Sequence, residues 1–278
     1  MSLIDFILNV AGLLLWLNWR AIPLTVQAPP GASLISTLRR ASPPRPRIYY
    51  LAGLIALLAG RALVYWQLGG QVRWDARIPL GPTTFWFRSD VLGRMALFSV
   101  CSFGVALGMF YLCLLLLSWI NGPVADTEPG QRLVRAQLGF LDRWPGAVKL
   151  LLPLLFSVAA WCLLHPWLAR LGLVPSNPHS GWRVPAQGAV IGLSAYLSLK
   201  YFLAAIFALH IFSSYVYLGE LPFWSFVNTT SNRLLRPLQC LPLRAGRLDF
   251  APVVAMLLVL FVAPFCQGGL TDLYKSLI

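Results

Sequence analysis

Charged residues are scarce in this 278-residue chain, at 11% of the sequence, whereas hydrophobic residues make up 58%. Soluble domains contain about 25% charged residues. A soluble core cannot hide this much apolar surface, so the composition excludes an ordinary water-soluble domain. Several apolar stretches approach or exceed the roughly 20 residues that a helix needs to cross a bilayer. The composition therefore predicts that the chain is embedded in a membrane.

Acidic residues and histidines are also few, with nine Asp and Glu and three His. The chain has no Walker loop, no G-x-S-x-G, no H-E-x-x-H and no C-x-x-C. His165 and His210 fall at opposite depths of their predicted spans, which argues against a haem shared between them. The sequence therefore predicts a protein that is not an enzyme and has no metal site and no cofactor.

Basic residues dominate the charge, and the formal net charge is +13. The arginines are distributed a few at a time over the loops between apolar stretches, without a dense basic block. This pattern is typical of membrane orientation and of contact with anionic headgroups. Nucleic acid is therefore excluded as a partner. The expected partners are anionic membrane lipids and other integral membrane subunits.

Six apolar stretches are predicted to span the membrane, which makes the fold class all-α transmembrane with one membrane domain, 1–278. The first and last stretches are short for a full span, and the third and fifth are long enough to protrude or kink. Gly104, Ala106 and Gly108 are small residues that would permit close helix contacts. The stretches lie at about 3–19, 49–68, 95–120, 149–169, 187–216 and 251–266.

An internal repeat of about 100 residues pairs these spans into three consecutive helical hairpins. Hairpin 1 covers 1–70 and is the most diverged, hairpin 2 covers 91–172, and hairpin 3 covers 187–269. The second helix of each hairpin is predicted to end at glycine. The loops within the hairpins are rich in arginine and proline, and they carry most of the lysine and arginine. We therefore expect these loops in the cytoplasm and both termini outside.

A motif in hairpin 3 runs from Phe223 to Leu260. It resembles the YggT family, whose pattern reads roughly P-L-L-R-P-L-R-R-L-L-P, then glycine, then D-x-S-P. Hairpin 2 resembles a degenerate copy with Ser118-Trp119 in place, but Ala136 stands where proline is expected and Leu150 where aspartate is expected. The matching residues in hairpin 3 are Leu234, Leu235, Arg236, Pro237, Leu238, Leu241, Pro242, Gly246, Asp249 and Pro252.

The resemblance implies a multi-pass protein of the bacterial inner membrane. Relatives in the family are linked to osmotic tolerance, to cell-division or nucleoid phenotypes, and in chloroplasts to assembly of a membrane cytochrome. None of these roles is a reaction. The resemblance therefore implies a class of membrane protein and leaves its molecular activity open.

The motif loop can also be interpreted from its residues alone. Ser231 or Asn232 could cap a short helix, on which Leu234, Leu235 and Leu238 would face lipid. Asp249 would cap the last span, where a carboxylate meets the positive end of the helix dipole. The loop is then either a topology signal or a specific docking surface. The arginines predicted to contact lipid or a partner are Arg132, Arg135, Arg233, Arg236, Arg244 and Arg247.

Two basic residues fall within apolar stretches, where a charge is costly and often functional. Arg61 lies near enough to a helix end to snorkel toward water, so it is interpreted as structural. Lys200 lies near the middle of the fifth stretch and is the stronger candidate for a function. The first hypothesis is a scaffold, assembly factor or accessory subunit of a membrane complex. The alternative is a small transporter or channel with a path near Lys200.

Overall fold

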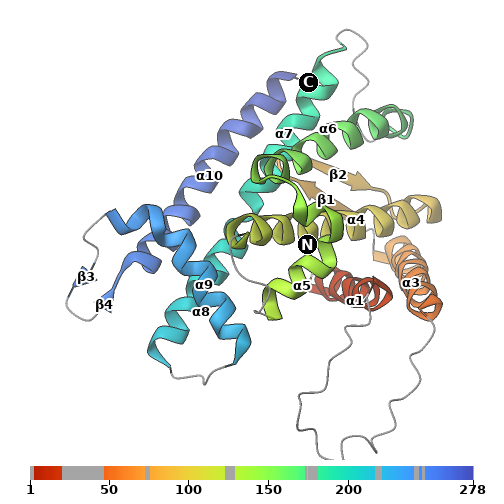
Figure 1. The fold of residues 1–278 in the computed structure, drawn as a ribbon. Helices are drawn as coiled ribbons and strands as arrows, with labels where there is room; N and C mark the ends of the chain where they lie inside the picture. Colours follow the sequence, from red (N-terminus) through yellow and green to blue (C-terminus); the bar gives the residue numbers. More distant parts are fainter. Residues whose placement is uncertain are drawn as a thin grey trace, which may run out of the picture. The chain divides into compact units, whose positions relative to one another are not determined.

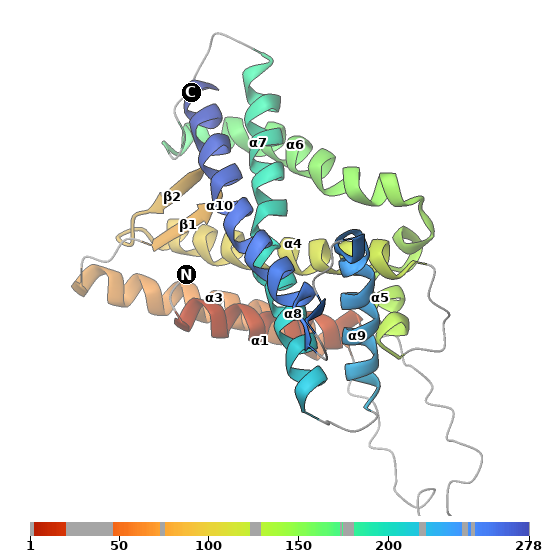
Figure 2. The same cartoon turned by 90° about the vertical axis from the view of Figure 1, so that its left-hand side faces the viewer.

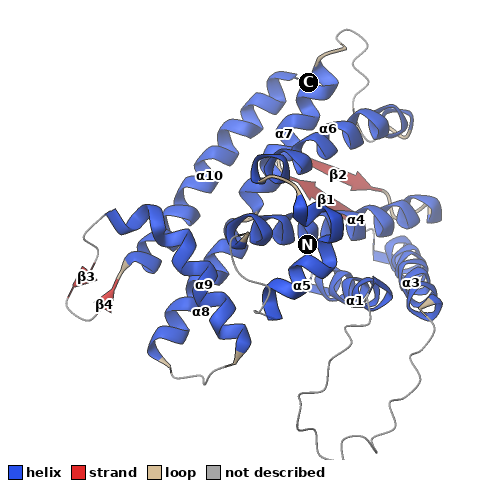
Figure 3. Cartoon of the chain, in the orientation of Figure 1, coloured by secondary structure: helices blue, strands red, loops and turns tan. Residues whose placement is uncertain are grey.

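The computed structural model describes residues 3–20, 47–72, 76–122, 129–172, 174, 181–216, 221–240, 244–245 and 248–277. These ranges are almost entirely helical, with two short two-stranded sheets (Figure 3). In this part of the chain six helices are long and apolar enough to cross a membrane, which confirms the predicted all-α transmembrane class. The candidate spans are Leu3–Arg20, Ile48–Gly69, Leu92–Asn121, Gly146–Arg170, Arg183–Tyr215 and Ala251–Leu277.

The chain divides into two compact units, the first of which comprises Met1–Ala76 and Phe87–Leu107. This unit contains α1 (Leu3–Arg20), α3 (Ile48–Val72) and the part of α4 (Leu92–Asn121) up to Leu107. Helices α1 and α3 lie side by side (Figures 1 and 2).

Helix α1 buries its polar face and exposes its apolar face. Its buried residues are Asp5, Asn9 and Gly12, which share one side of a helix because they are spaced by four and three residues. Leu3 and Phe6, in contrast, are 74% and 59% exposed. A Cβ at Gly12 would lie 2.8 Å from the Phe103 ring of α4, so glycine allows the two helices to approach closely. This inverted pattern fits a helix whose solvent is lipid.

The second unit comprises Arg77–Trp86 and Gly108–Ile278. In it, α7 packs along both α6 and α10 (Figure 2). After the end of α4, its described elements are α5 (Pro129–Leu138), η1 (Gly139–Arg143), α6 (Gly146–Arg170), α7 (Arg183–Ser198), α8 (Lys200–Tyr215), α9 (Pro222–Leu235), η2 (Arg236–Cys240), β3 (Arg244–Ala245), β4 (Leu248–Asp249) and α10 (Ala251–Leu277).

Small residues bring α6 and α7 together. A Cβ at Gly188 would lie 3.0 Å from the Val158 Cα, and a Cβ at Gly192 would lie 3.0 Å from the Ser157 Cβ. The two glycines are four residues apart, which is the small-xxx-small spacing of closely packed membrane helices. The prediction that Gly104 and Gly108 make close contacts was wrong, because a Cβ at either position would meet open space.

The boundaries of the long spans test two sequence predictions. The fifth span was expected to protrude or kink, and its helix is interrupted at Leu199, because α7 ends at Ser198 and α8 begins at Lys200. The prediction that the last span is short was wrong, because α10 continues through Gly268 and Gly269 to Leu277. A glycine ends a helix readily only when its backbone turns left-handed, as Gly172 does after α6 with φ of 70°. The repeat of about 100 residues stays a prediction.

A two-stranded sheet, β1 (Ala76–Leu80) paired with β2 (Thr83–Phe87), lies in the connection before α4 and was not predicted. Gly81 makes the turn with φ of 64°. The Arg77 guanidinium lies 3.8 Å from the centre of the Trp86 ring, which joins the two strands on one face. The available signal was the Gly-Pro turn followed by a run of threonine and aromatic residues.

Candidate functional site

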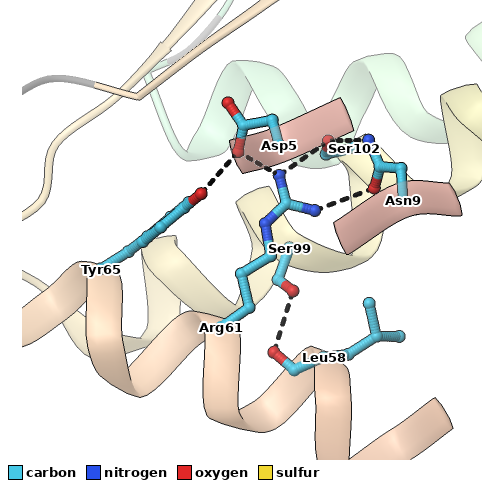
Figure 4. A network of polar contacts seen from close by, with 7 residues as sticks. All are labelled: Asp5, Asn9, Leu58, Arg61, Tyr65, Ser99 and Ser102. Atoms are coloured by element: carbon cyan, nitrogen blue, oxygen red, sulfur yellow. Dashed lines mark hydrogen bonds and ion pairs between the residues drawn. The ribbon is translucent and has the colours of Figure 1, made fainter. Parts of the chain in front are cut away.

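A buried ion pair joins α1 to α3 in the first unit (Figure 4). Arg61, on α3, is only 3% exposed and donates from Nη2 to Oδ1 of Asp5 at 2.7 Å. Its Nη1 donates to Oδ1 of Asn9 at 2.9 Å, and Nη2 also reaches the Ser102 hydroxyl at 3.0 Å. The Tyr65 hydroxyl donates to the same Asp5 oxygen at 2.8 Å.

Helical periodicity explains how this network assembles. Each of the three helices contributes two polar residues spaced three or four positions apart, which places each pair on one face. The Asn9 amide donates to the Ser102 hydroxyl at 3.1 Å, and the Ser99 hydroxyl donates to the Leu58 carbonyl at 2.9 Å. The pairs are Asp5 and Asn9 on α1, Arg61 and Tyr65 on α3, and Ser99 and Ser102 on α4.

The prediction that Arg61 snorkels toward water was wrong. Its guanidinium is enclosed, with the centres of the Phe98 and Tyr65 rings 5.0 Å and 5.5 Å away. The ion pair with Asp5 was not predicted, because Asp5 stands near the start of the chain. Asp5 nevertheless lies inside α1. The arrangement therefore acts as a clamp that sets the register of three helices.

A second ion-pair network surrounds Asp142 in the second unit. Its Oδ2 lies 3.1 Å from Nε of Arg135, and its Oδ1 lies 3.5 Å from Nζ of Lys149. The Ser118 hydroxyl donates to Asp142, and the Lys149 ammonium donates to that hydroxyl at 2.8 Å. The network connects the end of α4, helix α5, the η1 turn and the start of α6. Arg135, predicted to contact lipid or a partner, therefore also has an internal role.

The end of α4 is held against α9. The Arg233 Nη1 donates to the Ile120 carbonyl at 3.1 Å, and the Asn121 amide donates to the Thr230 hydroxyl at 2.8 Å. Carbonyl groups at a helix C-terminus lack partners within the helix, and a basic side chain there also meets the negative end of the dipole. Arg233 therefore caps α4 and has an internal role, while its predicted contact with lipid or a partner stays a prediction. Arg236 itself is exposed.

Two further predictions for the motif loop were wrong. Ser231 does not cap a helix, because α9 begins at Pro222 and buries Ser231 completely. Leu235 does not face lipid, because it is 3% exposed and belongs to a core cluster with Phe207, on α8, and Ala255, on α10. The spacing of the leucines predicted an apolar stripe, but it could not predict that α8 and α10 cover this stripe.

Lys200 begins α8 and lies where the fifth span is interrupted. It is 9% exposed, and its Nζ donates to the Gln267 side-chain oxygen on α10 at 3.3 Å. The same ammonium lies 5.1 Å from the centre of the Tyr201 ring. Its contacts are thus a neutral amide and an aromatic face, which join α8 to α10.

The elements that carry Lys200, Arg233 and Arg236 run from α7 to α10. Residues 189–270 match the CCB3/YggT family model. We call residues 189–270, which are similar to this family, the CCB3/YggT region. The match confirms the resemblance identified from the motif between Phe223 and Leu260, and together with the six apolar helices it indicates a multi-pass membrane protein. No curated protein and no solved structure matches the chain.

The other predicted site residues have mixed outcomes. Arg132, on α5, is exposed. In the CCB3/YggT region, Arg247 and the side chains of Arg244 and Asp249 lie outside the described residues, so their roles as lipid or partner contacts and as a helix cap stay predictions. The strands β3 and β4 that contain Arg244 and Asp249 pair antiparallel.

His165 and His210, which were considered as ligands of one haem, have separate contacts. The His165 ring packs edge-on against Trp161, and the His210 Nδ1 lies 2.8 Å from Oδ1 of Asn228. Within the ranges that the structure describes, no group of three or more His, Cys, Asp or Glu side chains could hold a metal ion.

Proposed function

We propose that the protein is a non-enzymatic scaffold, assembly factor or accessory subunit of a larger membrane protein complex in a bacterial inner membrane, with both termini outside. The proposal is supported mainly by the contacts of three buried cations, each of which joins helices or turns of this chain. Arg61 holds α1 to α3, Lys149 holds the η1 turn to α4, and Lys200 holds α8 to α10. Each buried cation serves the packing of this chain.

The exposed apolar faces also support a role in association. In α6 and in α10, only 11% of the 18-residue apolar stretch that could cross the membrane is buried within the protein. On α10, Phe261 and Phe265 are 77% and 86% exposed. Such faces are suited to contact with lipid or with the helices of another membrane subunit, because both surroundings are apolar.

Arginines at the ends of the spans would supply the polar part of the contact. Arg132 and Arg236 are exposed on α5 and η2, next to helices that end at the membrane surface. Each basic group near an anionic leaflet contributes about 1 kcal/mol to attraction. We propose that these residues, with Arg135, Arg244 and Arg247, contact anionic headgroups or an acidic surface of a partner.

Extraction of the protein at its natural abundance in a mild detergent tests the proposal. We expect mass spectrometry to find a second integral membrane protein in fixed stoichiometry with this chain. The control is the same extraction from cells in which an unrelated multi-pass protein carries the affinity tag. Recovery of this chain alone, or only with copies of itself, would exclude the subunit role.

The break at Leu199 favours the alternative function, a transporter or channel with a path near Lys200. Interrupted spans with polar groups at their breaks are common in transporters. If the protein is a scaffold, the Lys200→Met variant should keep the wild-type abundance and the wild-type yield of complex. The reason is that the lost hydrogen bond contributes only about 0.5–1.5 kcal/mol. Gln267→Leu, which removes the other partner, is the matched control. Loss of cellular activity in Lys200→Met, at unchanged abundance and complex yield, would favour the path instead.

A further inference from the structure

An open groove lies along α5 and η1 in the second unit. Its volume is about 670 Å³, and it is lined by Arg135, Gly139, Phe140, Asp142 and Arg143. The span of α4 ends shortly before this segment, at Asn121, and the span of α6 begins just after it, at Gly146. Because two candidate spans end beside this segment, we expect the groove at the depth of the lipid headgroups.

The groove has more positive than negative charge. Among the described residues that line it, the carboxylate is Asp142, which is paired with both Arg135 and Lys149 and accepts from Ser118. Arg143 is exposed, and no ion pair or hydrogen bond of its side chain occurs within the described part of the chain. Among the described residues that line the groove, two cations, Arg135 and Arg143, therefore accompany one carboxylate that is already engaged. The N-terminus of α6, three residues after Arg143, adds the positive end of a 25-residue helix.

Apolar side chains border the charged groove. Phe140 is 71% exposed and packs edge-on against Trp144, and Leu133 on α5 is 53% exposed. Helix α5 buries Val134 and Leu138 in a cluster with Leu114 and Leu115 of α4, whereas Arg132 and Leu133 are exposed. Aromatic rings beside basic groups are typical of the membrane interface, where acyl chains meet headgroups.

We propose that this groove binds the phosphodiester headgroup of an anionic phospholipid, with Arg143 as the main ligand. The Arg143 guanidinium can donate two parallel hydrogen bonds to one phosphate group, which lysine cannot reproduce. The ion pairs of Asp142 with Arg135 and Lys149 offset the negative charge that this carboxylate brings to the groove. The inference rests on the proposed anionic contact of the protein and specifies its ligand class and its principal residue.

Native mass spectrometry of the whole purified chain, with added phosphatidylglycerol as the probe, tests this site. We expect a phosphatidylglycerol adduct whose apparent affinity falls about tenfold in Arg143→Gln and to a smaller extent in Arg143→Lys. The matched control is Arg170→Gln, which removes an exposed arginine at the opposite end of α6. Thermal unfolding of each variant confirms that the fold is kept. An adduct that is equally abundant in Arg143→Gln would overturn the proposal.

Two further arms of the experiment identify the source of the phosphate. Phosphatidylcholine has the same phosphodiester but no net charge, so equal binding of this lipid would overturn the anionic part of the proposal. Displacement of phosphatidylglycerol by an equal concentration of inorganic phosphate would show that the groove binds free phosphate, which would overturn the lipid assignment. A missing lipid adduct in a protein that keeps its stoichiometric partner would refute this inference and leave the scaffold role intact.

Discussion

The Arg61→Met variant is expected to lose about 3–5 kcal/mol of unfolding free energy, because it removes the cation that pairs with the buried Asp5 carboxylate. Arg61 also bonds Asn9 and Ser102, so its removal affects all three helices of the first unit. The loss should appear as a lower midpoint of denaturant unfolding in detergent micelles. Aromatic fluorescence follows this transition directly, since Trp16 and Trp19 lie on α1.

Two variants control this prediction. The double variant Arg61→Met with Asp5→Asn removes both charges and should recover most of the lost stability, since an unpaired buried charge causes the larger part of the penalty. Arg88→Met breaks an ion pair with Asp90 whose two side chains are 70% and 52% exposed, so it should change stability by only about 0–1 kcal/mol. Wild-type stability of Arg61→Met would show that the clamp does not hold the helices.

The Asp142→Ala variant is expected to cause a comparable loss, about 3–5 kcal/mol, in the second unit. The Lys149 side chain is 8% exposed and would keep only the Ser118 hydroxyl as a partner, with Arg135 as a neighbouring like charge. Protease sensitivity of the segment from α5 to the start of α6 should rise, because Asp142 joins these elements. Limited proteolysis with mass spectrometry locates the cleavage sites.

The double variant Asp142→Ala with Lys149→Met should restore much of this stability, because it removes the buried charge as well. Asp272→Ala is the matched control, since Asp272 pairs with Lys275 on the exposed side of α10. Equal stability of Asp142→Ala and the wild type would show that the network around Asp142 is not needed for folding.

The six spans could be predicted because a bilayer imposes a minimum length on every apolar helix. The exact end of α10 could not, because Gly268 and Gly269 are compatible both with a helix end and with a helix interior. The sheet of β1 and β2 was missed because each strand has only five residues and lies in a connection that hydropathy does not resolve. Length and hydropathy therefore determine spans more reliably than their ends and connections.

The candidate site was predicted only in part, for a related reason. The sequence identified Arg61 and Lys200 as charges in apolar stretches, but a partner 56 positions away, such as Asp5, cannot be recognised before the helices are packed. The motif in the CCB3/YggT region was recognised from its residues, and the family match confirms it. The capping role of Arg233 depends on the end of α4, which no local pattern in the motif reveals.

The arginines of the CCB3/YggT region provide the most direct test of the proposed contact with a partner or an anionic lipid. Arg236, Arg244 and Arg247 are replaced together by lysine, which keeps the charge and the topology signal but removes the guanidinium fork. Arg233 is left unchanged because its bond to the Ile120 carbonyl holds α4. The yield of partner and of anionic lipid that co-purify with the chain is then measured. We predict a clear loss of both at unchanged abundance of the chain, and an undiminished yield of both would contradict the proposed contact.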